Sequence, residues 1–219
     1  MSIYVDYAAT TPIDKEILES MLGNADKFGN PSSIHRVGKE AKAFYETSRK
    51  NVAKELGANA DEIVFTGSAT EANNMVIRGI TGYYDKPHII TTAVEHASVK
   101  ETYGDVEKIA DVTYLSVDEN GQINVDELKN ALTEETKLVS IIMVNNETGT
   151  IQPMAEISEA VKDSNALLHV DAVQAFKQLP VNVDILNCDF LTLSGHKLHA
   201  PKGIGVLFVK RNTHLNRII

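Results

Sequence analysis

The chain of 219 residues carries a formal net charge of −9, and 43% of its residues are hydrophobic and 23% charged. This balance is ordinary for a globular domain and lacks the basic footprint of nucleic-acid-binding proteins, so nucleic acid is not expected among its partners. No apolar run approaches the roughly 20 residues that span a bilayer, no export signal is evident, and the single cysteine excludes an internal disulfide. We therefore expect a cytoplasmic protein that does not bind membranes.

The predicted elements follow one another in a repeating order. Apolar residues spaced three and four apart, including Val37, Phe44 and Leu56, predict the inner face of a long amphipathic helix. After it, short β-rich runs alternate with helical stretches. We predict strands at residues 63–66, 88–92, 112–115, 139–144, 167–170, 190–193 and 205–209, and helices at residues 69–80, 97–108, 125–132 and 155–162.

This alternation predicts the fold class. Strands separated by helices favour an α/β fold in which a mostly parallel sheet carries helices on both faces. No internal repeat or Pro/Gly-rich linker divides the chain, so residues 1–219 are interpreted as one domain. In such sheets a ligand binds outside the carboxyl ends of the strands, and candidate functional residues are therefore sought there.

Polar residues gather directly after five of the predicted strands. Taken alone, each has a simpler structural interpretation: Ser68 and Asp171 could be caps, Asn146 could belong to a turn, His96 could be a surface or core histidine, and Lys197 a solvated lysine. A parallel sheet, however, would bring all five clusters to one edge. The clusters are residues 67–71, residues 95–96, residues 145–147, Asp171 with Gln174, and residues 194–197.

The combined set of side chains matches the needs of one cofactor. A helix start preceded by glycine and serine suits a phosphate, and the amine of a lysine such as Lys197 forms Schiff bases with carbonyl compounds. An acid such as Asp171 can keep a pyridine nitrogen protonated, and a histidine such as His96 can stack on the ring and move protons. Together these features fit pyridoxal 5′-phosphate (PLP).

Other cofactor sites find no support. One cysteine and scattered histidines show no zinc-ligand spacing. The glycine-rich run at residues 202–205 has its lysine before the glycines and is followed by a strand, which is the wrong order for a phosphate-binding loop of the Walker type. No Gly-x-Gly-x-x-Gly follows the first strand, so a dinucleotide-binding fold is not indicated either.

At this point the sequence resembles the cysteine desulfurases of the class V aminotransferase-like, PLP-dependent enzymes. Each motif alone is weak, but they occur in the family's order and cover essentially the whole chain. They are residues 4–12, 29–35, 65–74, 95–96, 144–149, 169–174, and 194–197 with 201–205. The resemblance implies the large domain of PLP-dependent transferase fold type I.

The resemblance also implies a role for each candidate residue. Lys197 would form the Schiff base with PLP, Asp171 would pair with the pyridinium nitrogen, and His96 would stack on the ring and handle protons. Asn146 and Gln174 would hold the ring's oxygen substituent. The phosphate would be held by Ala69, Thr70, Ser194 and His196. In the family, L-cysteine becomes L-alanine and leaves a persulfide on an enzyme cysteine, from which sulfur passes to an acceptor or scaffold protein for iron–sulfur cluster assembly or tRNA thiolation.

The sequence departs from the family pattern in several places. Gly67 and Ser68 invert the more usual order, Ala200 stands where a glycine is usual, and Phe176 occupies another position where glycine is common. Family members are also roughly twice as long. The substrate-binding arginine, the mobile-loop cysteine and a partner-subunit phosphate contact would lie in the other half, so we interpret the chain as a truncated or split desulfurase. The intact enzyme is expected to be a homodimer with residues 29–35 near its interface.

Two alternatives remain open at this stage. The chain could belong to another class V PLP enzyme, such as a selenocysteine lyase or an aminotransferase, or it could be a remnant that binds PLP without catalysis. Cys188 is not expected to accept sulfur. It lies at the start of the run that leads to Lys197, and six residues of strand place it roughly 20 Å from Ser194.

Overall fold

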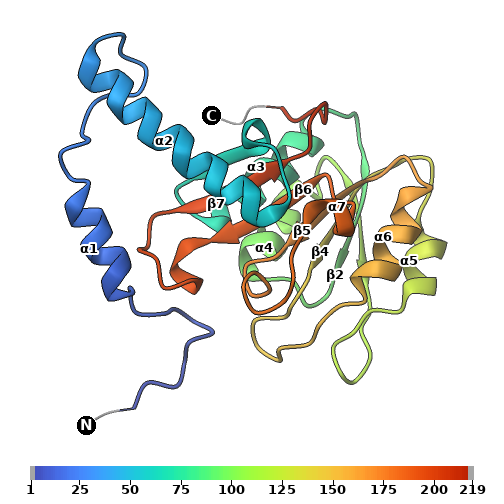
Figure 1. The fold of residues 1–219 in the computed structure, drawn as a ribbon. Coiled ribbons are helices and arrows are strands. Elements are labelled where there is room, and N and C mark those ends of the chain that lie inside the picture. The colour runs from blue at the N-terminus through green and yellow to red at the C-terminus, as the bar shows by residue number, and fades with distance from the viewer. Residues whose placement is uncertain (1–2, 217–219) are drawn as a thin grey trace.

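The computed structural model describes residues 3–216, which form one seven-stranded sheet with helices on both faces (Figure 1). The strand order is β1-β7-β6-β5-β4-β2-β3, and β7 runs antiparallel to both of its neighbours while the other pairs are parallel. The predicted α/β fold with a mostly parallel sheet is confirmed. The strands are β1 (Ile63–Thr66), β2 (His88–Thr92), β3 (Asp111–Leu115), β4 (Thr136–Ile142), β5 (Leu167–Asp171), β6 (Phe190–Ser194) and β7 (Gly205–Val209).

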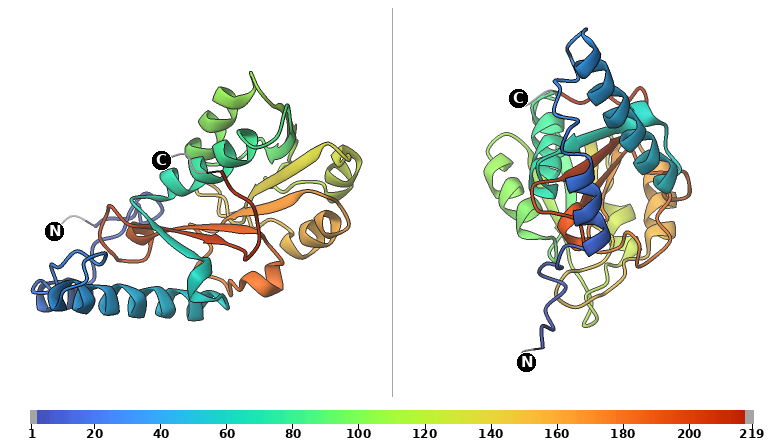
Figure 2. Two further views of the ribbon diagram at one scale, coloured as in Figure 1. Left: turned by 90° about the horizontal axis from the view of Figure 1, so that it is seen from above. Right: turned by 60° about the vertical axis from the view of Figure 1, so that its left-hand side comes forward.

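The helices divide the hydrophobic core into two layers. Buried residues of α3 and α4 pack on one face of the sheet, and those of α5, α6, α7 and the carboxyl-terminal end of α2 pack on the other, as the left view of Figure 2 shows. The helices are α1 (Lys15–Gly23), α2 (Arg36–Leu56), α3 (Ala69–Thr81), α4 (Ala97–Val106), α5 (Val125–Ala131), α6 (Met154–Lys162) and α7 (Val183–Leu186), with two 3-10 turns, η1 (Ala60–Glu62) and η2 (Gly195–Lys197).

All seven predicted strands are present, and β4 differs most from its predicted bounds. It begins three residues earlier than the predicted run 139–144 and ends two residues earlier, at Ile142. The chain leaves the sheet here because it folds back on itself: the N–H of Asn145 donates to the carbonyl of Thr150, and that of Gln152 donates to the carbonyl of Met143. The apolar residues Met143 and Val144 therefore lie in a loop beside the sheet and not in the strand.

The amino-terminal region projects away from this body (Figures 1 and 2). Helix α1, which the sequence did not predict, has no buried residue. The long helix α2 is present, but its predicted inner face is only partly correct: Ala41 and Leu56 are buried, whereas Phe44 is 43% exposed. Only the carboxyl-terminal end of α2 reaches the core, and this explains why a regular apolar spacing overstated the buried face.

Within residues 3–216, no helix combines the length and the apolar character needed to cross a membrane.

Candidate functional site

A cavity of about 190 Å³ lies at the carboxyl ends of the parallel strands, where the sequence predicts the ligand. It is formed by the segments that follow β1, β2, β4, β5 and β6, because these strands all run in one direction. All nine residues predicted from the sequence line it: Ala69, Thr70, His96, Asn146, Asp171, Gln174, Ser194, His196 and Lys197.

Lys197 reaches the cavity from the 3-10 turn η2, which directly follows β6. Its Nζ donates to the carbonyl oxygens of Ala8 and Ala9, the latter at 2.9 Å. Partial burial lowers the pKa of the Lys197 amine, although the nearby acids Asp6, Asp171 and Glu147 oppose this. A lysine whose amine loses its proton more readily is better suited to react with a carbonyl group.

Asp171 ends β5 and is only 3% exposed. Its carboxylate accepts hydrogen bonds from the N–H of Val173 and from Nδ2 of Asn73, each at 3.0 Å. The bond from Val173 is also the one that a turn-capping aspartate would make. No ion pair among the described residues includes Asp171, and burial raises the pKa of its carboxyl group. A buried carboxylate is costly without a positive partner, and the cavity beside Asp171 could admit one.

The start of α3 has the features of an anion site. Ser68 caps the helix by accepting from the N–H of Glu71 at 3.1 Å, and Glu71 accepts from the N–H of Gly67 at 2.7 Å. The simpler interpretation of Ser68 as a helix cap therefore applies. The next amides, those of Ala69 and Thr70, belong to the first helical turn and have no preceding carbonyl to bond, so they are available to a phosphate.

Gly205 allows β7 to begin against this same turn. A Cβ at Gly205 would lie 2.5 Å from the carbonyl carbon of Ser68 and 2.6 Å from Oγ1 of Thr66. Only glycine fits such a close approach of two backbone segments. At the inverted pair Gly67 and Ser68, the Gly67 amide donates to Glu71 and the Ser68 side chain caps α3.

His96 is the N-cap of α4, and its ring lines the cavity. The ring Nδ1 accepts from the N–H of Ser98 at 3.1 Å and lies 2.8 Å from the Ser98 hydroxyl. Ser98 in turn accepts from Nδ2 of Asn73, the same amide group that donates to Asp171. The sequence did not single out Ser98 or Asn73, because polar residues in the first turns of helices are common.

The two predicted amide side chains differ in their partners. Gln174 donates to the carbonyl of Ala8 at 2.9 Å, and Asn146 donates to the carboxylate of its neighbour Glu147 at 2.6 Å. The turn near Asn146 is organised by Asn145, whose Oδ1 accepts from the N–H groups of the two residues that follow Asn146. Asn146 itself is not needed for that turn.

The amino-terminal segment closes one side of the cavity. Ala9 lines it, and both the N–H and the hydroxyl of Thr11 donate to the carbonyl of His196, at 3.0 and 2.9 Å. The Thr10 hydroxyl lies 3.1 Å from Nδ1 of His196. The only sequence signal for these contacts is the motif at residues 4–12, and nothing in its residue types predicts where that segment docks.

Glu95 is a second buried acid near the cavity that the sequence assigned no role. Its Oε1 accepts from the Thr92 hydroxyl at 2.7 Å and from the N–H of Ile142 at 2.9 Å, while Oε2 has no partner among the described residues. Burial raises the pKa of Glu95 to about 8, and the Asp171 charge adds to the rise. Glu95 is therefore a neutral acid near pH 7 that ties the segment before His96 to the end of β4.

Three further sequence observations can be located in the structure. Cys188 is 1% exposed, and burial raises the pKa of its thiol to about 12, so it lacks the exposed thiolate of a sulfur nucleophile. Phe176 is 9% exposed within the larger core cluster. Ala200 donates its N–H to the carbonyl of Gly195 and so closes the turn after Lys197. Across residues 3–216, no cluster of three or more His, Cys, Asp or Glu side chains could hold a metal ion.

Comparison with known proteins gives consistent matches. Residues 3–217 match the family described as aminotransferase class-V. The chain is 45% identical to "Cysteine desulfurase IscS" of Dictyoglomus turgidum and 44% identical to "Putative cysteine desulfurase IscS 1" of Bacillus subtilis, covering 99% of this chain but 56% and 58% of those proteins. The solved structure "SspA in complex with cysteine" matches with a TM-score of 0.96 and 41% identity over 100% of this chain and 65% of that one. The chain thus spans a little over half the length of the curated relatives it matches.

Proposed function

The chain belongs to the class-V aminotransferase family, and from that premise we propose that it is the PLP-binding part of a cysteine desulfurase. The observation that carries the proposal is the convergence of Lys197, Asp171 and the start of α3 on one cavity. These supply, in order, an amine for the cofactor's aldehyde, an acid for its ring nitrogen and free amides for its phosphate.

The chemistry of the cavity residues fits PLP. Asp171 is a buried carboxylate without a cationic side chain as partner among the described residues, and a pyridinium nitrogen would supply that charge. Ala69 and Thr70 offer amides at a helix start, and Ser194 and His196 line the same cavity. PLP, when bound, supplies an electron sink for negative charge that develops on an amino acid substrate.

The remaining roles follow from the placement of the side chains. Asn146 and Gln174 are amide donors at the rim and would hold the ring's oxygen substituent. His96 would cover the ring and exchange hydrogen bonds or protons with the substrate. Lys197, once released from the cofactor, would be an amine within the cavity that can move a proton.

L-cysteine is the proposed substrate of the whole protein, and L-alanine and sulfur are its proposed products. The names of the relatives support this choice, and one structurally similar protein, SspA, was solved in complex with cysteine. We do not assign the sulfur-accepting thiol to Cys188, because that side chain is buried and is the chain's one cysteine. The activity therefore depends on residues that correspond to the remaining length of the relatives.

Three wider proposals accompany this function. The intact protein is a homodimer with residues 29–35 near the interface, it acts in the cytoplasm, and it passes sulfur to an acceptor or scaffold protein. The exposed residues Phe28 and Ile34, 82% and 89% accessible, are consistent with a contact at residues 29–35. Sedimentation of the full-length form showing only monomers would contradict the dimer.

Cofactor binding is tested by mixing the purified chain with PLP and recording its visible absorption. Borohydride reduction and peptide mapping should then place the cofactor on Lys197. Lys197→Ala should lose the bound chromophore, whereas the matched control Lys202→Ala, five residues away on the same segment, should keep it. Label on Lys202, or none on the folded wild-type chain, would contradict the proposal.

The proposed division of labour is tested with L-cysteine. The PLP-loaded chain should bind cysteine but should not produce alanine with sustained turnover, because it lacks an accessible thiol. Adding a polypeptide that corresponds to the remaining length of the relatives should restore turnover. Sustained activity of the chain alone that is lost in Cys188→Ser would contradict both the assignment and the geometry.

A further inference from the structure

A continuous row of hydrogen bonds connects Asp171 with His96 through two residues without an assigned role. Asn73, which is fully buried on α3, donates from Nδ2 to Oδ2 of Asp171 and to Oγ of Ser98, each at 3.0 Å. Ser98 Oγ lies 2.8 Å from Nδ1 of His96. The row crosses from β5 through α3 to the start of α4 and passes along the wall of the cavity.

The bond from Asn73 to Asp171 sets the direction of this row. Nδ2 of Asn73 donates to Oδ2 of Asp171, so the NH₂ group of Asn73 is turned toward Asp171. The same NH₂ group then faces Ser98, whose oxygen accepts from it and whose hydroxyl proton remains free for another partner. Oδ1 of Asn73 is buried without a partner among the described residues. The two bonds that Nδ2 donates therefore fix the orientation of the amide group.

Nδ1 of His96 lies at the end of the row and faces donors only. The backbone N–H of Ser98 donates to it at 3.1 Å, and a backbone N–H has no other role. The Ser98 hydroxyl lies 2.8 Å from the same nitrogen and can donate its free proton there. Nδ1 therefore carries no proton in the neutral ring, and the proton lies on Nε2, which has no partner among the described residues.

We propose that Asn73 and Ser98 are positioning residues that hold neutral His96 in its Nε2–H tautomer. His96 then presents a proton donor, and not a lone pair, to the ligand in the cavity. The inference rests on the proposed function for its biological meaning, because it specifies that the ligand atom facing Nε2 is a hydrogen-bond acceptor. It also couples the ring to Asp171, since the orientation of Asn73 depends on that carboxylate.

His35 provides a reference within the same chain. It is the N-cap of α2, and its Nδ1 accepts from the N–H of Gly38 at 3.2 Å. No hydroxyl group of the described residues is bonded to its ring. His35 thus has the backbone donor alone, whereas His96 has the backbone donor and the row behind it. The two histidines separate the contribution of the helix cap from the contribution of Ser98.

The tautomer is measured directly by long-range ¹H–¹⁵N spectra of the ring nitrogens in the purified chain without PLP, at a pH where the ring is neutral. His96→Gln assigns the signal. Wild type should show a proton on Nε2 and a lone pair on Nδ1. Ser98→Ala should raise the share of the Nδ1–H tautomer of His96 about fivefold, because one hydrogen bond contributes about that factor. The share should then approach that of the Nδ1–H tautomer of His35. Ser98→Thr, which keeps the hydroxyl, should restore the wild-type spectrum.

The control is Ser116→Ala, which removes a serine hydroxyl bonded to Glu127 and remote from the row. It should leave the His96 signals unchanged. A wild-type proton on Nδ1, or a folded Ser98→Ala variant with the wild-type share of tautomers, would overturn the proposal. Failure to bind PLP would instead contradict the proposed function alone, since these spectra are recorded without the cofactor.

Discussion

Two buried acids at opposite ends of the strands, Glu62 and Asp171, have opposite pKa shifts. Glu62 precedes β1 and is 8% exposed; burial raises its pKa, but hydrogen bonds from Asn59 and from the N–H of Arg211 outweigh burial and lower it. Asp171 ends β5 and is 3% exposed; there burial dominates and raises the pKa. The difference lies in the number of hydrogen bonds that each carboxylate accepts.

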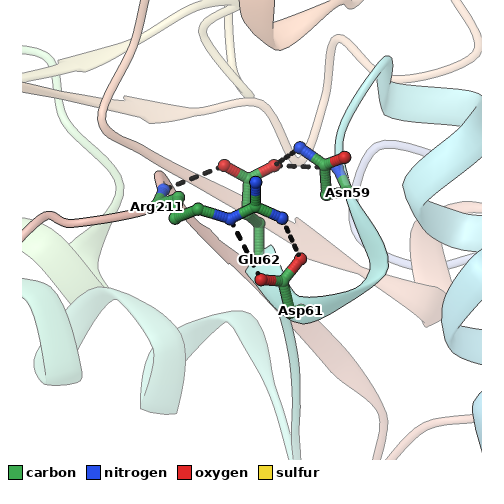
Figure 3. A network of polar contacts seen from close by, with 4 residues as sticks. All are labelled: Asn59, Asp61, Glu62 and Arg211. Carbon is green, nitrogen blue, oxygen red and sulfur yellow. Dashed lines mark hydrogen bonds and ion pairs between the residues drawn. The ribbon is translucent and has the colours of Figure 1, made fainter.

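Figure 3 shows how completely Glu62 is paired. One carboxylate oxygen accepts from the N–H of Arg211 at 2.8 Å, and the other accepts from the N–H and the side chain of Asn59 at 2.8 and 2.9 Å. Among the described residues, Asp171 accepts only from the N–H of Val173 and the Asn73 amide. A fully paired acid stabilises the fold, whereas an incompletely paired acid beside a cavity is available to a ligand.

The largest effect is expected for Asp171→Asn. The substitution should weaken PLP binding about a hundredfold, because it replaces a charge-assisted bond to the pyridinium by a neutral one. Absorbance titration of the chain with PLP measures the affinity. In the absence of PLP, the free energy of unfolding should not fall, since a buried, poorly paired charge has been removed. Unfolding of the variant without PLP would show that Asp171 is chiefly a structural cap.

Glu95 extends the comparison to a third buried acid, whose pKa is about 8. Because this folded-state pKa lies above the unfolded value, the folded chain loses stability as the pH rises from about 4.5 to about 8. Glu95→Gln keeps an acceptor for Thr92 and Ile142 and cannot ionise. It should match wild type at acid pH and exceed its free energy of unfolding by about 2 kcal/mol at pH 6 in urea titrations. Equal stability across this range would contradict a neutral Glu95.

Glu62→Gln should have the opposite sign. One carboxylate oxygen becomes a donor that faces N–H groups, so the free energy of unfolding at neutral pH should fall by about 1 kcal/mol. Because the pKa of Glu62 is lower in the folded chain, its ionised carboxylate stabilises the fold at pH values above the pKa of the unfolded chain. This stabilisation is lost as the pH falls through the pKa of the folded chain, so the stabilities of wild type and variant should converge in acid. The affinity for PLP should not change, and a change would contradict the contrast between Glu62 and Asp171.

The strands were well predicted from the sequence because each is bounded by turn residues. The runs 63–66, 88–92 and 205–209 agree with β1, β2 and β7 to the residue. The position of β7 between β1 and β6, and its antiparallel direction, were not predicted, because strand order depends on long-range packing that periodicity does not record. Helix α1 was not predicted, although Leu18, Met21 and Leu22 recur at helical spacing; none of its residues is buried.

The candidate site divides in the same way. The polar clusters after the strands were predictable because parallel strands end at one edge, and their nine residues do line one cavity. Asn73 and Ser98 were not predicted, because each lies on a helix and meets the site only where α3 packs beside α4. The pKa shift of Glu95 could not be read from the sequence either, since it depends on burial between β2 and β4.

The smallest effect is expected for Arg211→Ala, although Arg211 is prominent in the network around Glu62. Its guanidinium group pairs with Asp61 at 2.8 Å, but both side chains are more than half exposed, at 56% and 63%. Exposed pairs contribute little and are screened by salt. The bond that matters to Glu62 comes from the Arg211 backbone, which alanine retains. Urea titrations at low salt should therefore show a slight loss of stability that disappears at an ionic strength of about 1 M. Asp61→Asn should lose the same amount, and the double variant no more than either. A loss as large as that of Glu62→Gln, persisting in salt, would show that the side chain of Arg211 and not its backbone orders this edge of the sheet.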